Sequence, residues 1–241
     1  MAYTDILPDP NNLITDSGKA SGTGGEGFAS VSFSSKSPTM FDQTNSGRVI
    51  SRSVSQQTWS IDIKYNPLTR EDFEPVYNFI LQRGRMSPFY VSLPQNRVPQ
   101  DPTFAAYVDD PNNLFPTTNT VGGSRTLLLA NDSQDTGTTY VVATHKTPKP
   151  GDLFNISDSN HNKTYRVTRV ETTSDYTGDQ PATDQIRIQF TPGLSKAVTH
   201  AASGVVFHNP LVRVLLSSDV QQYSLNAAGL YSFSLKLKEA L

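Results

Sequence analysis

The four histidines are the first candidates for acid–base or metal chemistry, because imidazole titrates near neutral pH and binds transition metals. They lie far apart in the sequence, at His145, His161, His200 and His208, and no two have the spacing of a metal-binding pair. The sequence motifs of P-loops, dinucleotide-binding folds, zinc proteases and serine hydrolases do not occur. We therefore expect no catalytic, cofactor-binding or metal-binding residues, and no enzymatic activity.

The segment "DSNHN", residues 158–162, resembles the start of a calcium-binding loop because oxygen-bearing side chains alternate along it. Such loops need a glycine at their sixth position and a bidentate glutamate at their twelfth. Lys163 and Arg169 occupy those positions here. A polar hairpin turn is therefore the better interpretation of this segment.

Charged residues gather in two other places. Glu71, Asp72 and Glu74 precede an apolar helical pattern, where carboxylates stabilise the first turn through the helix dipole. Arg48 and Arg52 are four residues apart in a predicted strand, so they share one face of it. A basic face of this kind is usually solvated, but it could also line a channel or contact an acidic neighbour. These two arginines are candidate lumen or interface residues.

The composition limits the class of protein further. The chain has 241 residues and a formal net charge of −2, which argues against a phosphate backbone as its main partner. It has no cysteine, which excludes disulfide scaffolds, thiolate zinc sites and thiol nucleophiles. No apolar run approaches the length needed to span a bilayer.

A strand followed by a helix stands out between residues 58 and 84. The stretch "TWSIDIKY", residues 58–65, alternates apolar and polar side chains and predicts a strand with Trp59 buried. After it, apolar residues recur at helical spacing and predict one buried stripe; they are Phe73, Val76, Tyr77, Ile80 and Leu81. Thr69 or Asp72 can cap the helix, and Gly84 can end it. Phe79 lies off the stripe, so we expect it to contact a neighbouring subunit or a linker.

The remaining patterns indicate two blocks of strands. The first block is predicted at 28–33, 48–55, 88–93, 210–216 and 230–237, with 48–55 and 58–65 joined as a hairpin through "QQ" and paired with the C-terminal strands. The second block, predicted at 126–130, 139–144, 152–156, 164–170 and 185–190, has the short spacing of a small antiparallel barrel. We expect a flexible N-terminal arm at 1–27, one domain formed by 28–98 plus 208–241, a linker at 99–120 and an inserted barrel at 121–207.

The order of these parts resembles a known family. The stretches "FASVSFSSKSPTMF", "SGRVISRSVSQQTW", "WSIDIKYNPLT", "REDFEPVYNFILQRG" and "PFYVSLP" follow one another. They resemble the N-terminal domain of tailed-bacteriophage distal tail and minor tail proteins, which is a tail-tube-like hub. The stretch "KPGDLFNISDSNHNKTYRVTRV" is similar to a hairpin of the β-barrel domains inserted in such proteins.

The resemblance implies a mainly β fold, in which a tail-tube-like β-sandwich with one packed α-helix is interrupted by an inserted small β-barrel. It implies a structural virion protein that forms a ring, expected to be a hexamer, at the distal end of a phage tail and links the tail tube to the baseplate or tip. Expected partners are further copies of the chain, the tail tube protein, baseplate or hub proteins and the tape measure protein, with no membrane and no specific nucleic acid. Assembly is expected in the host cytoplasm. The alternative is a carbohydrate-binding adsorption module of a tail, with the barrel at 121–207 as the binding domain.

Overall fold

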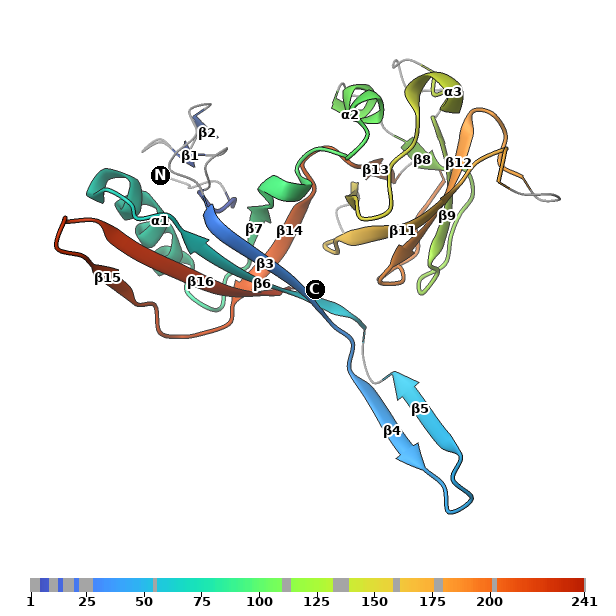
Figure 1. Cartoon of the computed structure of the whole chain (residues 1–241). Helices are drawn as coiled ribbons and strands as arrows, with labels where there is room; N and C mark the ends of the chain where they lie inside the picture. Colours follow the sequence, from blue (N-terminus) through green and yellow to red (C-terminus); the bar gives the residue numbers. More distant parts are fainter. Residues whose placement is uncertain are drawn as a thin grey trace. The chain divides into compact units, whose positions relative to one another are not determined.

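The computed structural model divides into two compact units, residues 1–92 with 212–241 and residues 93–211. Figure 1 shows the elements of both units, each of which is described here by itself. The described residues are 5–8, 13–14, 20–21, 28–53, 56–109, 114–131, 139–157, 161–175, 180–200 and 203–240.

The first unit is built on a six-stranded sheet. Its order is β3 (Phe28–Lys36), β6 (Thr58–Tyr65), β16 (Tyr231–Glu239), β14 (Leu211–Leu216) and β7 (Phe89–Ser92), while β15 (Tyr223–Leu225) pairs with the first part of β16. In the antiparallel pairing of β6 and β16, Leu235 lies opposite Ile63 and Leu237 opposite Ile61. The predicted pairing of the C-terminal strand with residues 58–65 is therefore confirmed.

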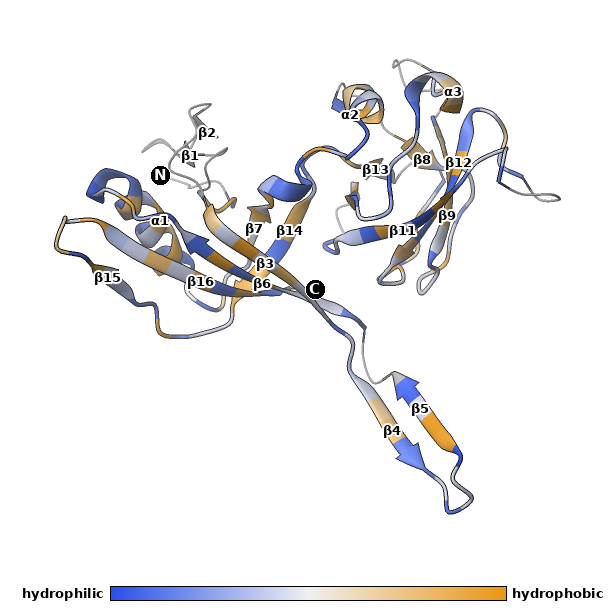
Figure 2. Cartoon of the chain, viewed as in Figure 1, coloured by the Kyte–Doolittle hydropathy of each residue, from blue (hydrophilic) through white to orange (hydrophobic). Residues whose placement is uncertain are grey.

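Alternation along the strands decides which face of this sheet is buried. Trp59, Ile61 and Ile63 are almost completely buried, and the polar or charged residues between them face outward. Figure 2 shows the resulting change of hydropathy along β6 and β16. Trp59 also stacks on Phe33 of the neighbouring strand, with 4.5 Å between ring centroids. The period of two in the sequence thus becomes one apolar and one polar sheet face.

The helix α1 (Arg70–Arg83) covers the apolar face through aromatic contacts. The ring of Phe73 stacks on Tyr231 at 4.5 Å and meets Phe233 edge-on at 5.7 Å. Thr69 caps the helix, since its Oγ1 accepts a hydrogen bond from the Asp72 N–H at 3.4 Å. Gly84 ends it with φ of 57°, a left-handed conformation that glycine adopts readily. Of the two predicted caps, Thr69 is the one that the structure uses.

Residues 48–53 do not join this sheet, which corrects one predicted pairing. Strand β5 (Val49–Ser53) pairs with β4 (Thr39–Gln43), and β6 pairs with β3 and β16. The turn between β4 and β5 contains Gly47 with φ of 80°. A two-residue hairpin loop usually needs such a residue, and "QQ" at 56–57 offers none. The hairpin therefore forms around the turn that contains Gly47, between β4 and β5, and not around residues 56–57.

The second unit contains a closed six-stranded barrel. Around it the order is β10 (Leu153–Ser157), β11 (Tyr165–Glu171), β12 (Gln185–Thr191), β9 (Thr126–Asn131), β8 (Leu114–Pro116) and β13 (Gly204–Val206). The core includes Phe154, which stacks on Tyr165 with 5.3 Å between centroids, and Phe190. The short elements η1 (Pro94–Asn96), α2 (Pro102–Asp109) and α3 (Val142–His145) complete the unit. The predicted fold class, mainly β with a small barrel, is confirmed.

Two predictions about this unit are wrong. The segment 99–120, predicted as a linker, contains α2 and the barrel strand β8. Phe104 and Leu114 in this segment are buried in the barrel core, because a closed barrel needs the strand that β8 supplies between β9 and β13. Residues 142–145 of the predicted strand 139–144 form α3 instead.

The first eight residues include a segment that binds its own chain. The Leu7 N–H donates to the Tyr90 carbonyl at 2.8 Å, and the Tyr90 N–H donates to the Asp5 carbonyl at 2.7 Å. Leu7 is fully buried within its own chain. The short strands β1 (Leu13–Ile14) and β2 (Ala20–Ser21) pair with each other. Most of the predicted flexible arm at 1–27 lies outside the described residues.

Among the described residues, no helix combines the length and hydropathy that crossing a membrane would require.

Candidate assembly interface

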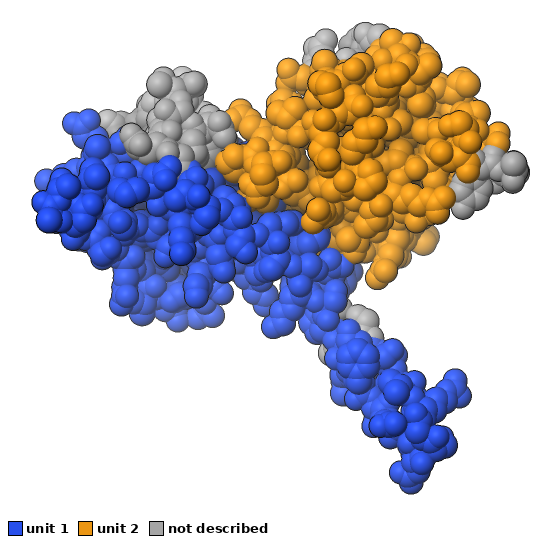
Figure 3. Space-filling model, in the orientation of Figure 1, with its two compact units in different colours: residues 1–92, 212–241 blue, residues 93–211 orange. Residues whose placement is uncertain are grey.

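The β4–β5 hairpin extends away from the rest of the first unit, as Figure 3 shows. Its turn is closed by a hydrogen bond of 3.0 Å from the Thr44 N–H to the Arg48 carbonyl and one of 2.8 Å from the Gly47 N–H to the Thr44 carbonyl. In the part of the chain that the structure describes, β4 and β5 form a separate two-stranded sheet. Such a hairpin is only marginally stable by itself in water.

Both faces of the hairpin carry exposed apolar side chains. Met40, Phe41, Val49 and Ile50 are 57%, 73%, 63% and 53% exposed. Residues directly opposite each other share a face, so Phe41 lies with Ser51 and, diagonally, with Val49, while Met40 lies with Arg52 and Ile50. Four large apolar side chains on one small element are typical of a protein-binding surface.

The structure places the two candidate arginines on this hairpin. Arg52 belongs to β5 and lies opposite Met40, and Arg48 ends the turn just before β5. Both are exposed. They therefore flank the apolar side chains of the hairpin and do not lie on the face of the main sheet, where the predicted pairing of 48–55 would have placed them.

Phe79, the third candidate interface residue, is buried within its own chain. It is fully inaccessible and packs against Phe89 of β7, whereas Leu81, predicted as part of the buried stripe, is 57% exposed. The guanidinium carbon of Arg83 lies over the Phe79 ring, 5.5 Å from its centroid. The interface prediction for Phe79 is therefore wrong, because β7 supplies its partner.

The edges of the main sheet differ in how they are covered. Beyond β7, the backbone of residues 5–7 continues the hydrogen bonding of the sheet, and the Asp5 carboxylate forms an ion pair with Arg83. The strands β3 and β15 each pair with one neighbour in the described part of the chain. An outer strand with unpaired backbone groups can accept a strand from another molecule. These two strands are thus candidate docking edges.

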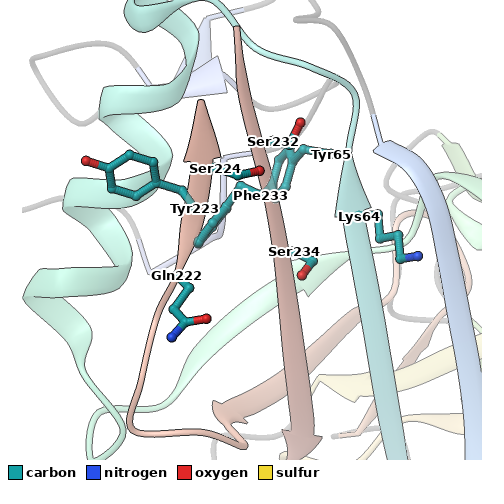
Figure 4. A pocket seen from close by; sticks show the side chains of 8 residues that line it. All are labelled: Lys64, Tyr65, Gln222, Tyr223, Ser224, Ser232, Phe233 and Ser234. Atoms are coloured by element: carbon teal, nitrogen blue, oxygen red, sulfur yellow. The ribbon is translucent and has the colours of Figure 1, made fainter. Parts of the chain in front are cut away.

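Strand β15 borders a surface pocket of about 420 Å³. Figure 4 shows the side chains that line it; they are Lys64, Tyr65, Gln222, Tyr223, Ser224, Ser232, Phe233 and Ser234. Tyr223 packs on Phe73 and Tyr77 of α1, at 5.1 and 5.4 Å between centroids, and is still 49% exposed. Leu225 is 58% exposed. The edge of β15 is therefore partly apolar, and Tyr223 anchors it to the helix α1.

Acidic residues lie at the same end of the sheet as β15. Leu68 exchanges two backbone hydrogen bonds of 2.8 Å with Tyr231, which pairs with Leu225 on its other side. The helix begins two residues later and carries Glu71, Asp72 and Glu74 in its first turns. The Glu71 side chain is exposed, and Glu74 forms an ion pair of 3.4 Å with Arg70. The first turns of α1 therefore carry a net negative charge, while the hairpin is net positive.

Four aromatic residues of the second unit that could have formed a carbohydrate-binding face are buried. Tyr140, Phe154, Tyr165 and Phe190 are buried, and Tyr176 lies outside the described residues. A carbohydrate-binding face needs exposed aromatic rings, so these four cannot form one. The buried rings instead fill the barrel core.

Two titratable groups of this unit have shifted pKa values. Burial raises the pKa of the Tyr140 hydroxyl well above its usual range, and nearby Tyr107 and Asp101 add to the rise. The Tyr140 hydroxyl donates a hydrogen bond to the Lys146 carbonyl. The hydrogen bond from the Thr172 hydroxyl lowers the pKa of the exposed Asp175 carboxyl. Both shifts follow from local structure.

His145, His200 and His208 lie beside polar groups of their own chain. The Val141 N–H donates to His145 Nδ1 at 2.9 Å, and His200 Nδ1 lies 2.7 Å from the Pro116 carbonyl oxygen. His208 Nδ1 lies 3.2 Å from an Asp109 carboxylate oxygen. Over the residues that the structure describes, no group of three or more possible ligands is arranged to hold a metal ion.

Comparison with known proteins gives two matches. Residues 7–96 match the family described as "Distal tail protein pb9, A domain, N-terminal". The chain is also 28% identical over 219 residues to the distal tail protein pb9 of Escherichia phage T5, which covers 90% of this chain and 94% of that protein. The family match spans β3, the β4–β5 hairpin, β6, α1 and β7.

Proposed function

Because this chain belongs to the distal tail proteins of tailed bacteriophages, we propose that it forms a ring at the distal end of the tail and links the tail tube to the baseplate or tip. A distal tail protein is a structural component of the phage tail, so it resides in the virion. In the proposed ring, the unit formed by residues 1–92 with 212–241 builds the hub, and residues 93–211 form the inserted unit that contains the barrel.

The observation that supports the ring is that one unit carries two unlike candidate docking surfaces. The hairpin with its exposed Phe41 and Ile50 is one, and the outer strand β15 is the other. Figure 1 shows them at opposite ends of the main sheet. Contacts between unlike surfaces are head-to-tail, and they close into a ring when the rotation between neighbours allows it. A hexamer is proposed from the family resemblance.

Further partners follow from the proposed position. A ring between tube and tip contacts the tail tube protein on one side and baseplate or hub proteins on the other, and its lumen faces the tape measure protein. No cofactor and no catalytic activity are part of this function. The adsorption alternative is not proposed, since Tyr140, Phe154, Tyr165 and Phe190, on which a sugar-binding face would depend, are buried.

Electron microscopy of the phage particle tests the proposal directly. We expect a closed ring of this chain between the last ring of the tail tube and the tip, with six-fold symmetry. Light scattering of the purified chain, measured over a range of concentrations, adds the mass of the assembly. A monomer attached to the side of a fibre, with the barrel directed at a glycan, would overturn the ring.

A further inference from the structure

The β4–β5 hairpin, residues 39–53, has apolar side chains that no other described part of its chain covers. Its four apolar side chains are exposed, and its strands pair with each other within the described part of the chain. Two strands alone bury too little apolar surface to be independently stable. A surface outside this hairpin is needed to cover Met40, Phe41, Val49 and Ile50.

We propose that the hairpin of one copy docks along the outer edge of β15 of the next copy. This inference rests on the ring of the proposed function and names the contact that holds the ring together. The occupant of the β15 edge is thus a second copy of the chain, and the contact is head-to-tail.

Both surfaces carry exposed aromatic and aliphatic side chains. β15 offers Tyr223 and Leu225, about half exposed on a strand whose outer backbone groups are available for pairing. Addition of a strand at such an edge supplies main-chain hydrogen bonds, while side chains on alternate positions give specificity. Phe41 and Val49 share one face of the hairpin, as Tyr223 and Leu225 share one face of β15. Whichever hairpin strand adds to β15, its apolar side chain on that face, Phe41 of β4 or Val49 of β5, can then lie beside Tyr223 or Leu225.

The charges of the two surfaces are complementary. The hairpin carries Arg48 and Arg52 against one acid, Asp42, and is net positive. The first turns of α1, at the β15 end of the sheet, carry three acids against Arg70 and are net negative. Complementary charge favours one partner and one orientation, and increases the rate of encounter. A second copy offers both the apolar and the acidic part of this surface, which favours it as the occupant.

Cross-linking between two single-cysteine variants tests the contact. The chain has no cysteine, so Ser51→Cys on the hairpin and Ser224→Cys on β15 each introduce one thiol. Both serines are exposed, which makes the substitutions mild. The two variants are mixed in equal amounts under assembly conditions and treated with a short bismaleimide. Val121→Cys, at an exposed position of the second unit, replaces Ser224→Cys in the control mixture.

We expect at least about tenfold more cross-linked dimer from the Ser51/Ser224 mixture than from the Ser51/Val121 mixture, a ratio that corresponds to a clear preference of contact. A chain carrying both Ser51→Cys and Ser224→Cys should give a ladder that ends at the size of the ring. Equal cross-linking in the two mixtures, with a ring still present by light scattering, would overturn the hairpin contact and leave the proposed function standing. A chain that stays monomeric at every concentration would overturn both.

Discussion

Phe79 of α1 and Phe89 of β7 pack edge-to-face, with 5.4 Å between ring centroids and 90° between ring planes. Both rings are fully buried. The pair ties the end of the helix to the last strand of the main sheet, the same strand whose outer edge is covered by residues 5–7. Edge-to-face pairs add to the free energy of folding beyond the apolar area they bury. This contact therefore stabilises the fold of the first unit and does not contribute to contacts between copies.

Substitution of Phe79 should destabilise the fold much more than substitution of Leu81. We expect Phe79→Ala to lower the free energy of unfolding by about 3–5 kcal/mol, because it removes a buried aromatic ring and leaves a cavity. Leu81→Ala, on the exposed side of the same helix, should change it by about 0.5 kcal/mol or less. Urea unfolding of the two variants measures the difference. Equal losses would contradict the burial pattern of α1.

Glu239 should stabilise the sheet through the backbone of β6. Its Oε2 accepts a hydrogen bond of 3.1 Å from the Trp59 N–H, and both residues are buried. Glu239→Ala leaves that N–H without this acceptor, which should cost about 1–3 kcal/mol of unfolding free energy. Lys238→Ala, at the exposed neighbouring position, is the control. A loss for Glu239→Ala no larger than for the control would show that the hydrogen bond contributes nothing.

Polar substitutions in the hairpin should affect assembly and spare the fold. In Phe41→Ser combined with Ile50→Ser, the unfolding free energy of the monomer should change by about 0.5 kcal/mol or less, since both side chains are exposed. The mass measured by light scattering should fall to that of the monomer. Val98→Ser combined with Val121→Ser removes exposed apolar side chains from the second unit and should leave the mass unchanged. A normal ring from the hairpin variant would refute the prediction.

Charge reversal should show how much the charged side chains contribute to the contact between the hairpin and the neighbouring copy. Arg48→Glu combined with Arg52→Glu places acids opposite the acidic turns of α1, so the yield of rings should fall. Adding Glu71→Lys and Glu74→Lys to that chain should restore it. Arg125→Glu combined with Lys196→Glu makes the same change of net charge at exposed positions of the second unit and serves as the control. Failure of the second reversal to restore assembly would place the arginines against another surface.

The barrel should lose stability at high pH through Tyr140. The pKa of a tyrosine in an unfolded chain is about 10, and burial raises the pKa of Tyr140 above that value. The folded state therefore holds this proton more tightly, so its contribution is complete below about pH 10 and is lost as the pH rises through the folded pKa. In Tyr140→Phe the group cannot ionise. We expect the stability difference between the original chain and this variant to shrink from about pH 8 to about pH 11, measured by urea unfolding. A difference that stays constant would show that the pKa of Tyr140 is the same in the folded and unfolded states.

Local patterns along the sequence were sufficient to predict most of the elements in the main sheet. The sequence also contains no recognised catalytic motif. Alternation from Trp59 to Tyr65 predicts which face of β6 is buried, because successive side chains of a strand point to opposite sides whatever the strand pairs with. The cap at Thr69 and the end at Gly84 follow from side-chain and backbone chemistry within one turn of the helix. These features depend on near neighbours in the chain, and the sequence contains that information.

Only the tertiary structure decided the features that depend on distant partners. Phe79 and Leu81 flank the central stripe of α1 on opposite sides, since residues follow one another by about 100° around a helix. Helical spacing favoured Leu81, but the position of Phe89 buries Phe79 instead. β8 is too short and too irregular in sequence to be recognised as a strand, and it becomes one because the barrel closes through it. Arg48 and Arg52 became parts of an exposed hairpin because β6 pairs with β3 and β16, which leaves β5 to pair with β4.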